Sequence, residues 1–159
     1  MLSPKPPSDS ATEMVQVVLP NDANPLGFIL GGSVMHLVDI AGAIAAHRHT
    51  RSLVVTAAVD ELQFLHPIKV GDLIILKARV TCTFQTSLET QVDVYSEETL
   101  TGEKKLTSRA FLTFVAVTED GQRLRVPPLL VETEEERQVQ AAARVRREER
   151  LKRRATPRA

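Results

Sequence analysis

A single carboxylate, Asp39, stands inside an otherwise apolar stretch of the sequence. Residues 24–49 read NPLGFILGGSVMHLVDIAGAIAAHRH. If a helix begins near Gly32, its first backbone N–H groups are unpaired and carry the positive end of the helix dipole. The glycines at positions 31 and 32 leave these groups open to close approach, which suits the polarisation of a carbonyl or the binding of an oxyanion. The segment therefore combines a candidate base with a candidate oxyanion site.

Two interpretations of Asp39 stay open from the residues alone. Its spacing from His36 and Ala43 puts the three residues on one helix face. Desolvation among apolar neighbours would raise the pKa of its carboxyl group and make it a better general base. The alternative is a satisfied buried acid that caps a loop or pairs with Arg48 or His36. The Gly-Gly pair does not separate the two, because it could also ease the packing of the helix on a sheet.

Other catalytic and cofactor-binding patterns are missing from the sequence. It has no P-loop, no Gly-x-Gly-x-x-Gly after a strand and no Cys/His spacing typical of metal sites. Ser33 is not part of a Gly-x-Ser-x-Gly elbow, and His47 and His49 point in different directions on a helix. The single cysteine, Cys82, lies in a predicted strand and is interpreted as a buried thiol rather than a nucleophile. The segment around Asp39 is left as the main candidate for chemistry.

Hydrophobic patterning predicts an α+β domain that would position this segment. One strand is followed by a helix that is apolar on every side, and therefore buried, and then by four long strands. The last three strands form an antiparallel meander, which favours a strongly curved sheet around a central helix. The strands are expected at 13–20, 52–66, 71–84, 87–98 and 104–118, and the helix at 32–49.

The two ends of the chain differ in composition from this domain, which we place at residues 13–126. Residues 1–12 are rich in Pro and Ser and are predicted to form a flexible N-terminus. Residues 127–159 are predicted to form a C-terminal helix with a basic tail, acidic at its start and basic at its end. The simplest interpretation is a solvated helix with a frayed end, and the alternatives are contacts with phosphates, a neighbouring subunit or nucleic acid.

Composition argues against several classes of partner. The chain is 43% hydrophobic and 25% charged, which is typical of one globular domain. A formal net charge of zero and only 4% aromatic residues argue against nucleic acid. No apolar stretch reaches the ~20 residues that span a bilayer, and the first residues lack the apolar core of a signal peptide. A lone cysteine cannot form an internal disulfide, so we expect a cytoplasmic protein. From the charge, the aromatic content and the lack of an apolar span, we expect neither nucleic acid nor a membrane as a partner.

Residues 24–49 resemble the signature of hotdog-fold acyl-CoA thioesterases, in the branch of broad-specificity cytosolic acyl-CoA hydrolases. The likeness continues in the family's order through VDELQFLHPIKVGD, TSLETQVDVYSEE, LTSRAFLTFVAV and DGQRLRVPPL, and it covers roughly residues 10–150. The resemblance implies a hotdog fold, in which an antiparallel sheet wraps around the central helix. It also implies hydrolysis of acyl-CoA to free fatty acid and CoA without a metal or cofactor, CoA being part of the substrate.

The same resemblance implies a site shared between subunits. Such domains pair into dimers with a continuous sheet, and this branch commonly forms trimers of dimers, that is, homohexamers. Asn24 of one subunit would meet Asp39 of the other, beside the amides of Gly31 and Gly32. Asp39 would act as a general base on water or as a nucleophile that gives an anhydride. Gly32 would polarise the thioester carbonyl, and Asn24 would orient the water or the carbonyl.

The resemblance also suggests contacts for the substrate. The acyl tail is expected against Met35, Val38 and Phe64. The edge amides expected to bind the pantetheine belong to Thr56, Ala57, Ala58 and Val59. Candidates for the CoA phosphates are Lys69, Arg79, Arg109 and the tail arginines. Two other functions stay open: a non-catalytic hotdog protein that binds acyl-CoA, and a hotdog dehydratase, which would use a histidine such as His36.

Overall fold

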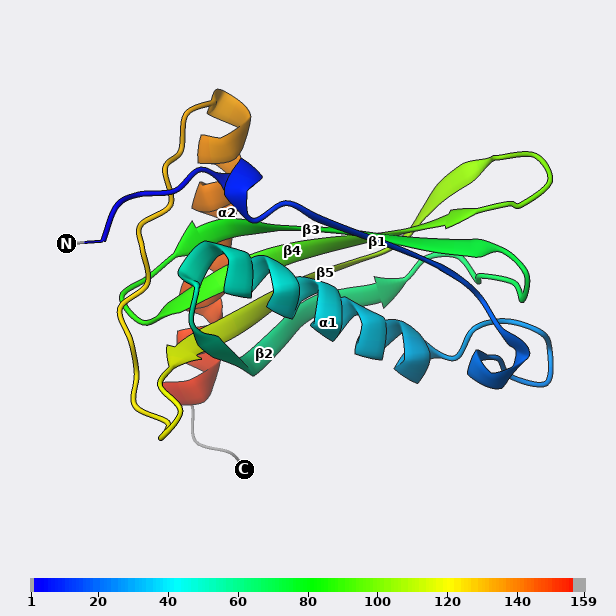
Figure 1. The fold of residues 1–159 in the computed structure, drawn as a ribbon, viewed down its shortest axis with the longest axis horizontal. Coiled ribbons are helices and arrows are strands. Elements are labelled where there is room, and N and C mark those ends of the chain that lie inside the picture. The colour runs from blue at the N-terminus through cyan, green and yellow to red at the C-terminus, as the bar shows by residue number, and fades with distance from the viewer. Residues whose placement is uncertain (1, 156–159) are drawn as a thin grey trace.

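The structure is a computed structural model that describes residues 2–155, and Figure 1 shows its single sheet and two α-helices. All neighbouring strands are antiparallel, in the order β1-β3-β4-β5-β2, so β1 and β2 form the two edges. The strands are β1 Thr12–Val17, β2 Leu53–Phe64, β3 Leu73–Thr83, β4 Ser87–Glu97 and β5 Lys104–Val117. The helices are α1 Gly31–Thr50 and α2 Glu134–Ala155, with short 3-10 helices η1 Pro7–Asp9 and η2 Pro20–Asp22.

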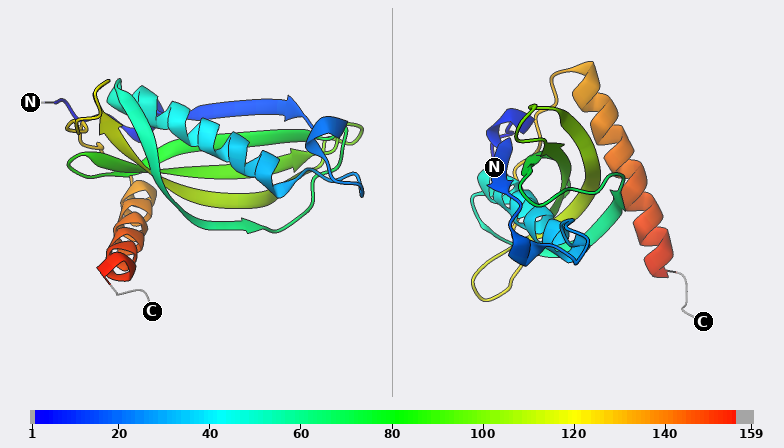
Figure 2. Two further views of the ribbon diagram at one scale, coloured as in Figure 1. Left: turned by 90° about the horizontal axis from the view of Figure 1, so that it is seen from below. Right: turned by 90° about the vertical axis from the view of Figure 1, so that its right-hand side faces the viewer.

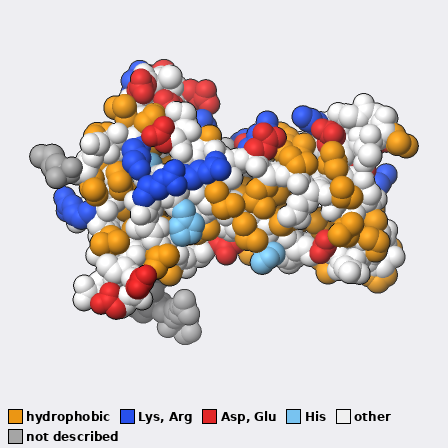
Figure 3. Space-filling model, in the orientation of Figure 1, with side chains coloured by type: hydrophobic (Ala, Val, Ile, Leu, Met, Phe, Trp, Pro, Cys, Tyr) orange, Lys and Arg blue, Asp and Glu red, His pale blue; other side chains and the backbone are white. Residues whose placement is uncertain are grey.

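The sheet curls around α1, which lies along its concave side (Figure 2). Small residues allow the close approach, because Ala41 and Ala45 are fully buried. A Cβ atom at Gly42 would lie 2.9 Å from Oγ1 of Thr90 and 3.1 Å from the ring of Phe114. This arrangement confirms the predicted α+β hotdog fold. Hydrophobic side chains nevertheless remain at the surface of the face that carries α1 and β1 (Figure 3).

Two β-bulges in β2 determine which of its side chains face α1. The first is at Ala57: Thr56 pairs with Phe114 and Ala58 with Thr113, so β2 has one residue more than β5. An extra residue resets the alternation of side chains between the two faces of a sheet. The simple period-two pattern of a strand therefore does not hold along β2.

The second bulge lies between Asp60 and Gln63. Their partners on β5, Phe111 and Arg109, are separated by a single residue, whereas two residues separate Asp60 from Gln63. Glu61 takes a left-handed conformation there, with φ 58°. The bulge again shifts the alternation by one position, and it therefore controls the direction of the residues that follow it.

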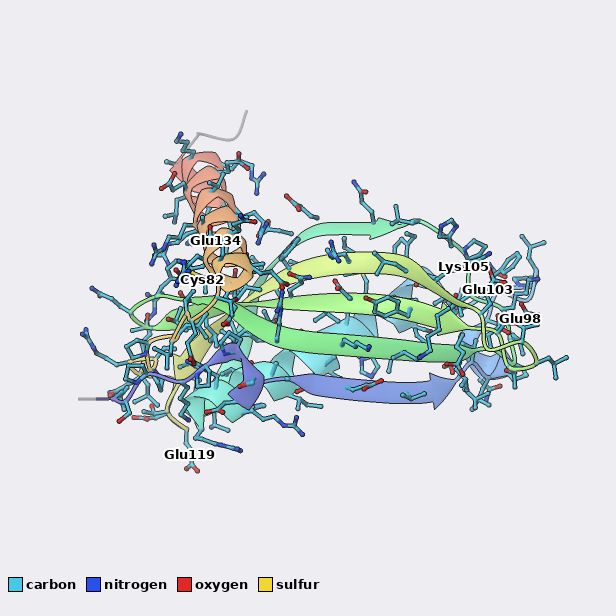
Figure 4. The ribbon with its side chains drawn as sticks, turned by 90° about the horizontal axis from the view of Figure 1, so that it is seen from above. Cys82, Glu98, Glu103, Lys105, Glu119 and Glu134 are labelled. Atoms are coloured by element: carbon cyan, nitrogen blue, oxygen red, sulfur yellow. The ribbon has the colours of Figure 1, made fainter. Side chains whose placement is uncertain are left out.

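The helix α2 crosses the convex face of the sheet near Cys82, as Figure 4 shows. Arg146 donates to both carboxylate oxygens of Glu89 on β4, at 2.9 and 3.0 Å. Its guanidinium also lies 3.5 Å from the ring centroid of Phe111 on β5. The helix is therefore docked through its basic residues, which differs from the solvated helix expected from its composition. Among residues 2–155, no helix is long and apolar enough to cross a membrane.

The ends of the chain also differ from the sequence-based expectations. The N-terminal segment is attached to the domain from Lys5 onward, because the N–H of Lys5 bonds to the carbonyl of Pro128 and the buried Oγ of Ser10 accepts from the N–H of Val80. The helix predicted within 127–159 begins only at Glu134. Residues 156–159 of the predicted basic tail lie outside the described residues.

Candidate active site

Asp39 is held by a hydrogen bond from the neighbouring edge strand. Oγ1 of Thr56 on β2 donates to Oδ1 of Asp39 on α1 at 2.7 Å. The pair borders a hollow of about 300 Å³ between α1, β2 and β5, which His36 also lines. The remaining lining residues are apolar or glycine: Gly32, Met35, Val38, Val59, Leu62 and Leu112. A carboxylate beside such a hollow suits a general base or nucleophile that acts on a substrate with an apolar tail.

Asp39 is exposed in the single chain, which contradicts the burial inferred from the sequence. The sheet covers only one side of α1, so the side that carries Met35, His36 and Asp39 is left open. The alternative in which Asp39 pairs with Arg48 is not found, since that guanidinium donates to the carbonyl of Ala11 at 2.7 Å. The desolvation invoked for Asp39 is therefore not a property of the single chain.

The start of α1 presents two backbone amides. The carbonyl of Leu30 accepts from the N–H groups of Ser33 and Val34, and α1 has no side-chain cap. The N–H groups of Gly31 and Gly32 therefore remain without a partner among residues 2–155. A Cβ atom at position 32 would meet nothing within 4 Å, so a ligand can approach this amide closely.

Gly31 serves packing as well. A Cβ atom there would lie 3.3 Å from Cζ of Phe64, so the phenyl ring lies directly against the start of the helix. This contact places the end of β2 beside the amides of α1.

Asn24 has its side-chain oxygen occupied by its own loop. Oδ1 accepts from the N–H groups of Leu26 at 3.0 Å and Phe28 at 3.1 Å, so the orientation of the amide is fixed. The groups left to act on a ligand are the Nδ2 N–H donors. Asn24 lines a second hollow, of about 350 Å³, together with Gly31 and Phe64.

The two hollows divide the predicted site residues within one chain. Gly32, Met35, Asp39, Thr56 and Val59 lie at the first hollow, while Asn24, Gly31 and Phe64 lie at the second. Ala57 and Ala58 line neither hollow. Asn24 and Asp39 are therefore not brought together by a single chain.

Sequence reasoning missed several lining residues. These are Leu62 and Leu112 at the first hollow, and Phe28, Ile29, Val34, Leu65, His66, Pro67, Ile68 and Ser108 at the second. The missing signal is the bulge in β2, because strict alternation from Val59 would turn the side chain of Leu62 away from α1.

Most basic residues considered for phosphate binding are already paired. Arg109 donates to both carboxylate oxygens of Asp93, and this hydrogen bonding raises the pKa of the guanidinium. Arg79 pairs with Glu135 at 3.5 Å. Lys69 is exposed. Within residues 2–155, no group of three or more His, Cys, Asp or Glu side chains could hold a metal ion.

Cys82 has the character expected of a packed thiol. It is buried, and this burial raises the pKa of its thiol. A raised pKa disfavours the nucleophilic thiolate, so the structure agrees with the non-catalytic interpretation.

Known proteins with similar sequences are acyl-CoA hydrolases. The profile of the family described as "Thioesterase superfamily" matches residues 26–103. The Bacillus subtilis protein described as uncharacterized acyl-CoA thioester hydrolase YkhA is 40% identical over 119 residues, which cover 75% of this chain and 69% of that protein. The chain spans only 37% of the length of the human, rat and mouse cytosolic acyl coenzyme A thioester hydrolases that it matches.

Solved structures of similar proteins share the fold. The apo-hexameric acyl-CoA thioesterase superimposes with a TM-score of 0.93 at 42% identity, over 98% of this chain and 100% of that one. An acyl-CoA hydrolase from Staphylococcus aureus, solved with butyryl coenzyme A, coenzyme A and coenzyme A disulfide, gives 0.87 at 33% identity, over 94% and 92% of the chains. That hydrolase has also been solved as variants with an Asp, an Asn or a Thr replaced by Ala. The shared fold and the extent of the sequence identity lead to one conclusion: this chain belongs to the thioesterase superfamily.

Proposed function

We propose that this chain is a cytoplasmic acyl-CoA thioesterase, which hydrolyses acyl-CoA to free fatty acid and CoA without a metal or cofactor. The observation that carries the proposal is the Asp39–Thr56 hydrogen bond at an apolar hollow, on the same helix whose first turn has the unpaired amides of Gly31 and Gly32. A base, an oxyanion site and space for an acyl tail are the parts that thioester hydrolysis needs.

The spacing of three residues supports the assignment. In the Staphylococcus aureus hydrolase, the replaced Asn and Asp stand 15 positions apart, and the replaced Thr follows the Asp by 17. Asn24, Asp39 and Thr56 have the same two separations. The three residue types and both intervals thus coincide with those selected for replacement in a protein solved with butyryl coenzyme A.

In the general-base route, Asp39 takes a proton from water as the water oxygen bonds to the thioester carbonyl carbon. The N–H groups at the start of α1 stabilise the oxyanion, and an Nδ2 donor of Asn24 orients the carbonyl. The C–S bond then breaks, and the CoA sulfur receives the proton from Asp39. In the nucleophilic route, an Asp39 oxygen bonds to the same carbon and the C–S bond breaks, which gives a mixed anhydride and releases CoA as the thiolate. Water then hydrolyses the anhydride to free fatty acid and the Asp39 carboxylate, and the proton it releases neutralises the CoA thiolate. Thr56 holds Oδ1 in both routes and leaves Oδ2 to react.

The complete site requires two subunits. Asn24 and Asp39 line different hollows of one chain, and the side of α1 with Asp39 is uncovered. The edge strand β2 also exposes Leu53, Val55 and Val59. Pairing of two β2 edges about a two-fold axis would cover these residues and extend the sheet across both chains. We take this dimer as the catalytic unit, and the hexameric thioesterase of the same fold favours a trimer of such dimers.

Release of free thiol from acyl-CoA tests the proposal. The wild-type chain is expected to hydrolyse acyl-CoA, and Asp39→Ala is expected to lose at least about 100-fold in kcat while its melting temperature and oligomeric state stay those of the wild type. Lys77→Ala, on the convex face away from both hollows, serves as the control and should keep full activity. A folded Asp39→Ala protein with most of the wild-type turnover would contradict the proposal. Tight binding of acyl-CoA by a wild-type chain that hydrolyses none of it would favour the non-catalytic alternative.

A further inference from the structure

The segment of β2 between the two bulges is attached to α2. Asp60, on the convex side of β2, accepts from Nη1 of Arg150 at 3.0 Å and lies 3.4 Å from Nη2 of Arg153. The side chains of Asp60 and Arg150 are only 13% and 14% exposed, whereas that of Arg153 is 68% exposed. Arg150 is therefore the cation that fixes Asp60, and Arg153 adds a screened contact.

The position of Asp60 matters because the second bulge follows it directly. Val59 pairs with Leu112 and lines the Asp39 hollow, so Asp60 points to the other face. The extra residue, Glu61, then returns the side chain of Leu62 to the α1 side, where it also lines the hollow. Without the bulge, alternation would turn Leu62 toward the convex face and remove one wall of the hollow.

We propose that the Asp60–Arg150 ion pair is a positioning and specificity device: by fixing the bulge at Glu61, the C-terminal helix holds Leu62 as a wall of the acyl pocket. The inference rests on the proposed function, because it assigns the acyl tail to the Asp39 hollow. Loss of the pair frees Leu62 to leave the hollow, so a longer acyl chain is accommodated. Arg150 does not line the hollow and acts only through Asp60.

A matched control exists in the same helix. Arg146 and Glu89 form another buried ion pair between α2 and the sheet, with side chains 12% and 3% exposed. Glu89 belongs to β4 and lines neither hollow. Breaking either pair weakens the docking of α2, but only the pair at Asp60 includes a residue of β2. Arg146 reaches the bulge only indirectly, through the ring of Phe111, the partner of Asp60 on β5. Chain-length preference thus separates a positioning role from a merely structural one.

The test compares acetyl-CoA and octanoyl-CoA, by kcat/KM and by calorimetric Kd, in wild type, Arg150→Gln, Arg146→Gln and Leu62→Ala. The ratio of octanoyl to acetyl kcat/KM should rise about tenfold in Arg150→Gln, the discrimination that one methylene gives in an apolar pocket. Leu62→Ala should raise the ratio in the same direction, and adding Arg150→Gln to it should give no further rise. Arg146→Gln should lower the melting temperature and leave the ratio within twofold of wild type.

The inference is overturned if Arg150→Gln leaves the ratio unchanged, if Arg146→Gln changes it equally, or if the effects of Arg150→Gln and Leu62→Ala multiply. If Arg150→Gln does not fold, Arg150→Lys keeps the charge without the guanidinium fork and should show a smaller rise. A wild-type chain that hydrolyses neither thioester contradicts the proposed function instead. In that case the ratio of the Kd of octanoyl-CoA to the Kd of acetyl-CoA, compared among the same variants, tests the inference in place of kcat/KM.

Discussion

Two variants, Asn24→Ala and Asp39→Ala, prepared separately, each lack one half of the proposed site. In the proposed dimer every site combines Asn24 of one chain with Asp39 of the other, so each homodimer would have two defective sites. The division of these residues between two hollows of a single chain is the structural basis of this arrangement. The two proteins should be nearly inactive separately and regain activity when their subunits exchange.

The size of the recovery follows from the two-fold symmetry. Random exchange of equal amounts makes about half of all dimers mixed, and each mixed dimer contains one site with both native residues and one site with neither. The mixture should therefore reach about one quarter of the wild-type kcat, if the defective sites contribute nothing. A trimer of dimers gives the same fraction, because each dimer carries its own pair of sites.

The assay measures thiol release from octanoyl-CoA before and after exchange, which is induced by mild denaturant and dilution. Native mass spectrometry of one isotopically labelled preparation confirms that mixed dimers have formed. Self-mixing of each variant through the same cycle is the control, and it should give no recovery. Absence of recovery after confirmed exchange would refute the shared site and would place both residues of each site in one chain.

Three further changes test the positioning of the base, the packing of α1 and the role of a buried histidine. Thr56→Val removes the 2.7 Å hydrogen bond to Asp39 without changing side-chain shape, so kcat/KM should fall by about 10- to 100-fold at unchanged melting temperature, as measured by thiol release. Gly42→Ala should destabilise the fold by about 1–3 kcal/mol in urea unfolding, since the new Cβ would lie 2.9 Å from Oγ1 of Thr90, and adding Thr90→Ala should restore part of the loss. Burial lowers the pKa of the His49 imidazole from its usual 6.5, so the unfolded chain binds this proton more readily than the folded chain does. The stability that the neutral imidazole gives the fold is complete above about pH 6.5. It is lost as the pH falls below that value. The urea concentration at the midpoint of unfolding, measured between pH 5 and 8, should therefore fall toward acid pH in the wild type and fall less in His49→Gln. The same pH dependence in both proteins would contradict this assignment.

The strands and the central helix could be predicted from the sequence because their patterns are local. The strand expected at 87–98 alternates cleanly, and β4 covers Ser87–Glu97 with Leu88, Val92 and Val94 buried. The glycines and alanines of the helix segment are typical of a helix packed closely on a sheet, and Gly42 touches the sheet as such packing requires. Local periodicity was sufficient to place these elements, although β3 and β5 also carry one register shift each against β4.

Features that depend on pairing between distant elements could not be predicted in the same way. Nothing in the residues of β2 indicates the two bulges, which appear only in its register with β5. Glu89 lies on the face of β4 opposite Leu88 and Thr90, where the alternation of the strand puts polar side chains. It is nevertheless buried, because Arg146 of a distant helix neutralises it there. The face of Leu62 and the docking of α2 are both consequences of such long-range contacts.

The exposure of Asp39 likewise could not be predicted from the sequence, because it depends on whether α1 is covered by its own chain alone or also by a partner. A helix that is apolar on every side needs cover on every side, and the sheet supplies it only along the face that includes Val38 and Ala41. The face with Met35 and Asp39 stays open, next to the apolar edge of β2. Because a partner chain on β2 would cover this face, the burial inferred from the sequence would be a property of the proposed dimer. Formation of the dimer would then bury Asp39 and bring Asn24 of the other subunit to it at the same time, so a monomer of this chain would be inactive.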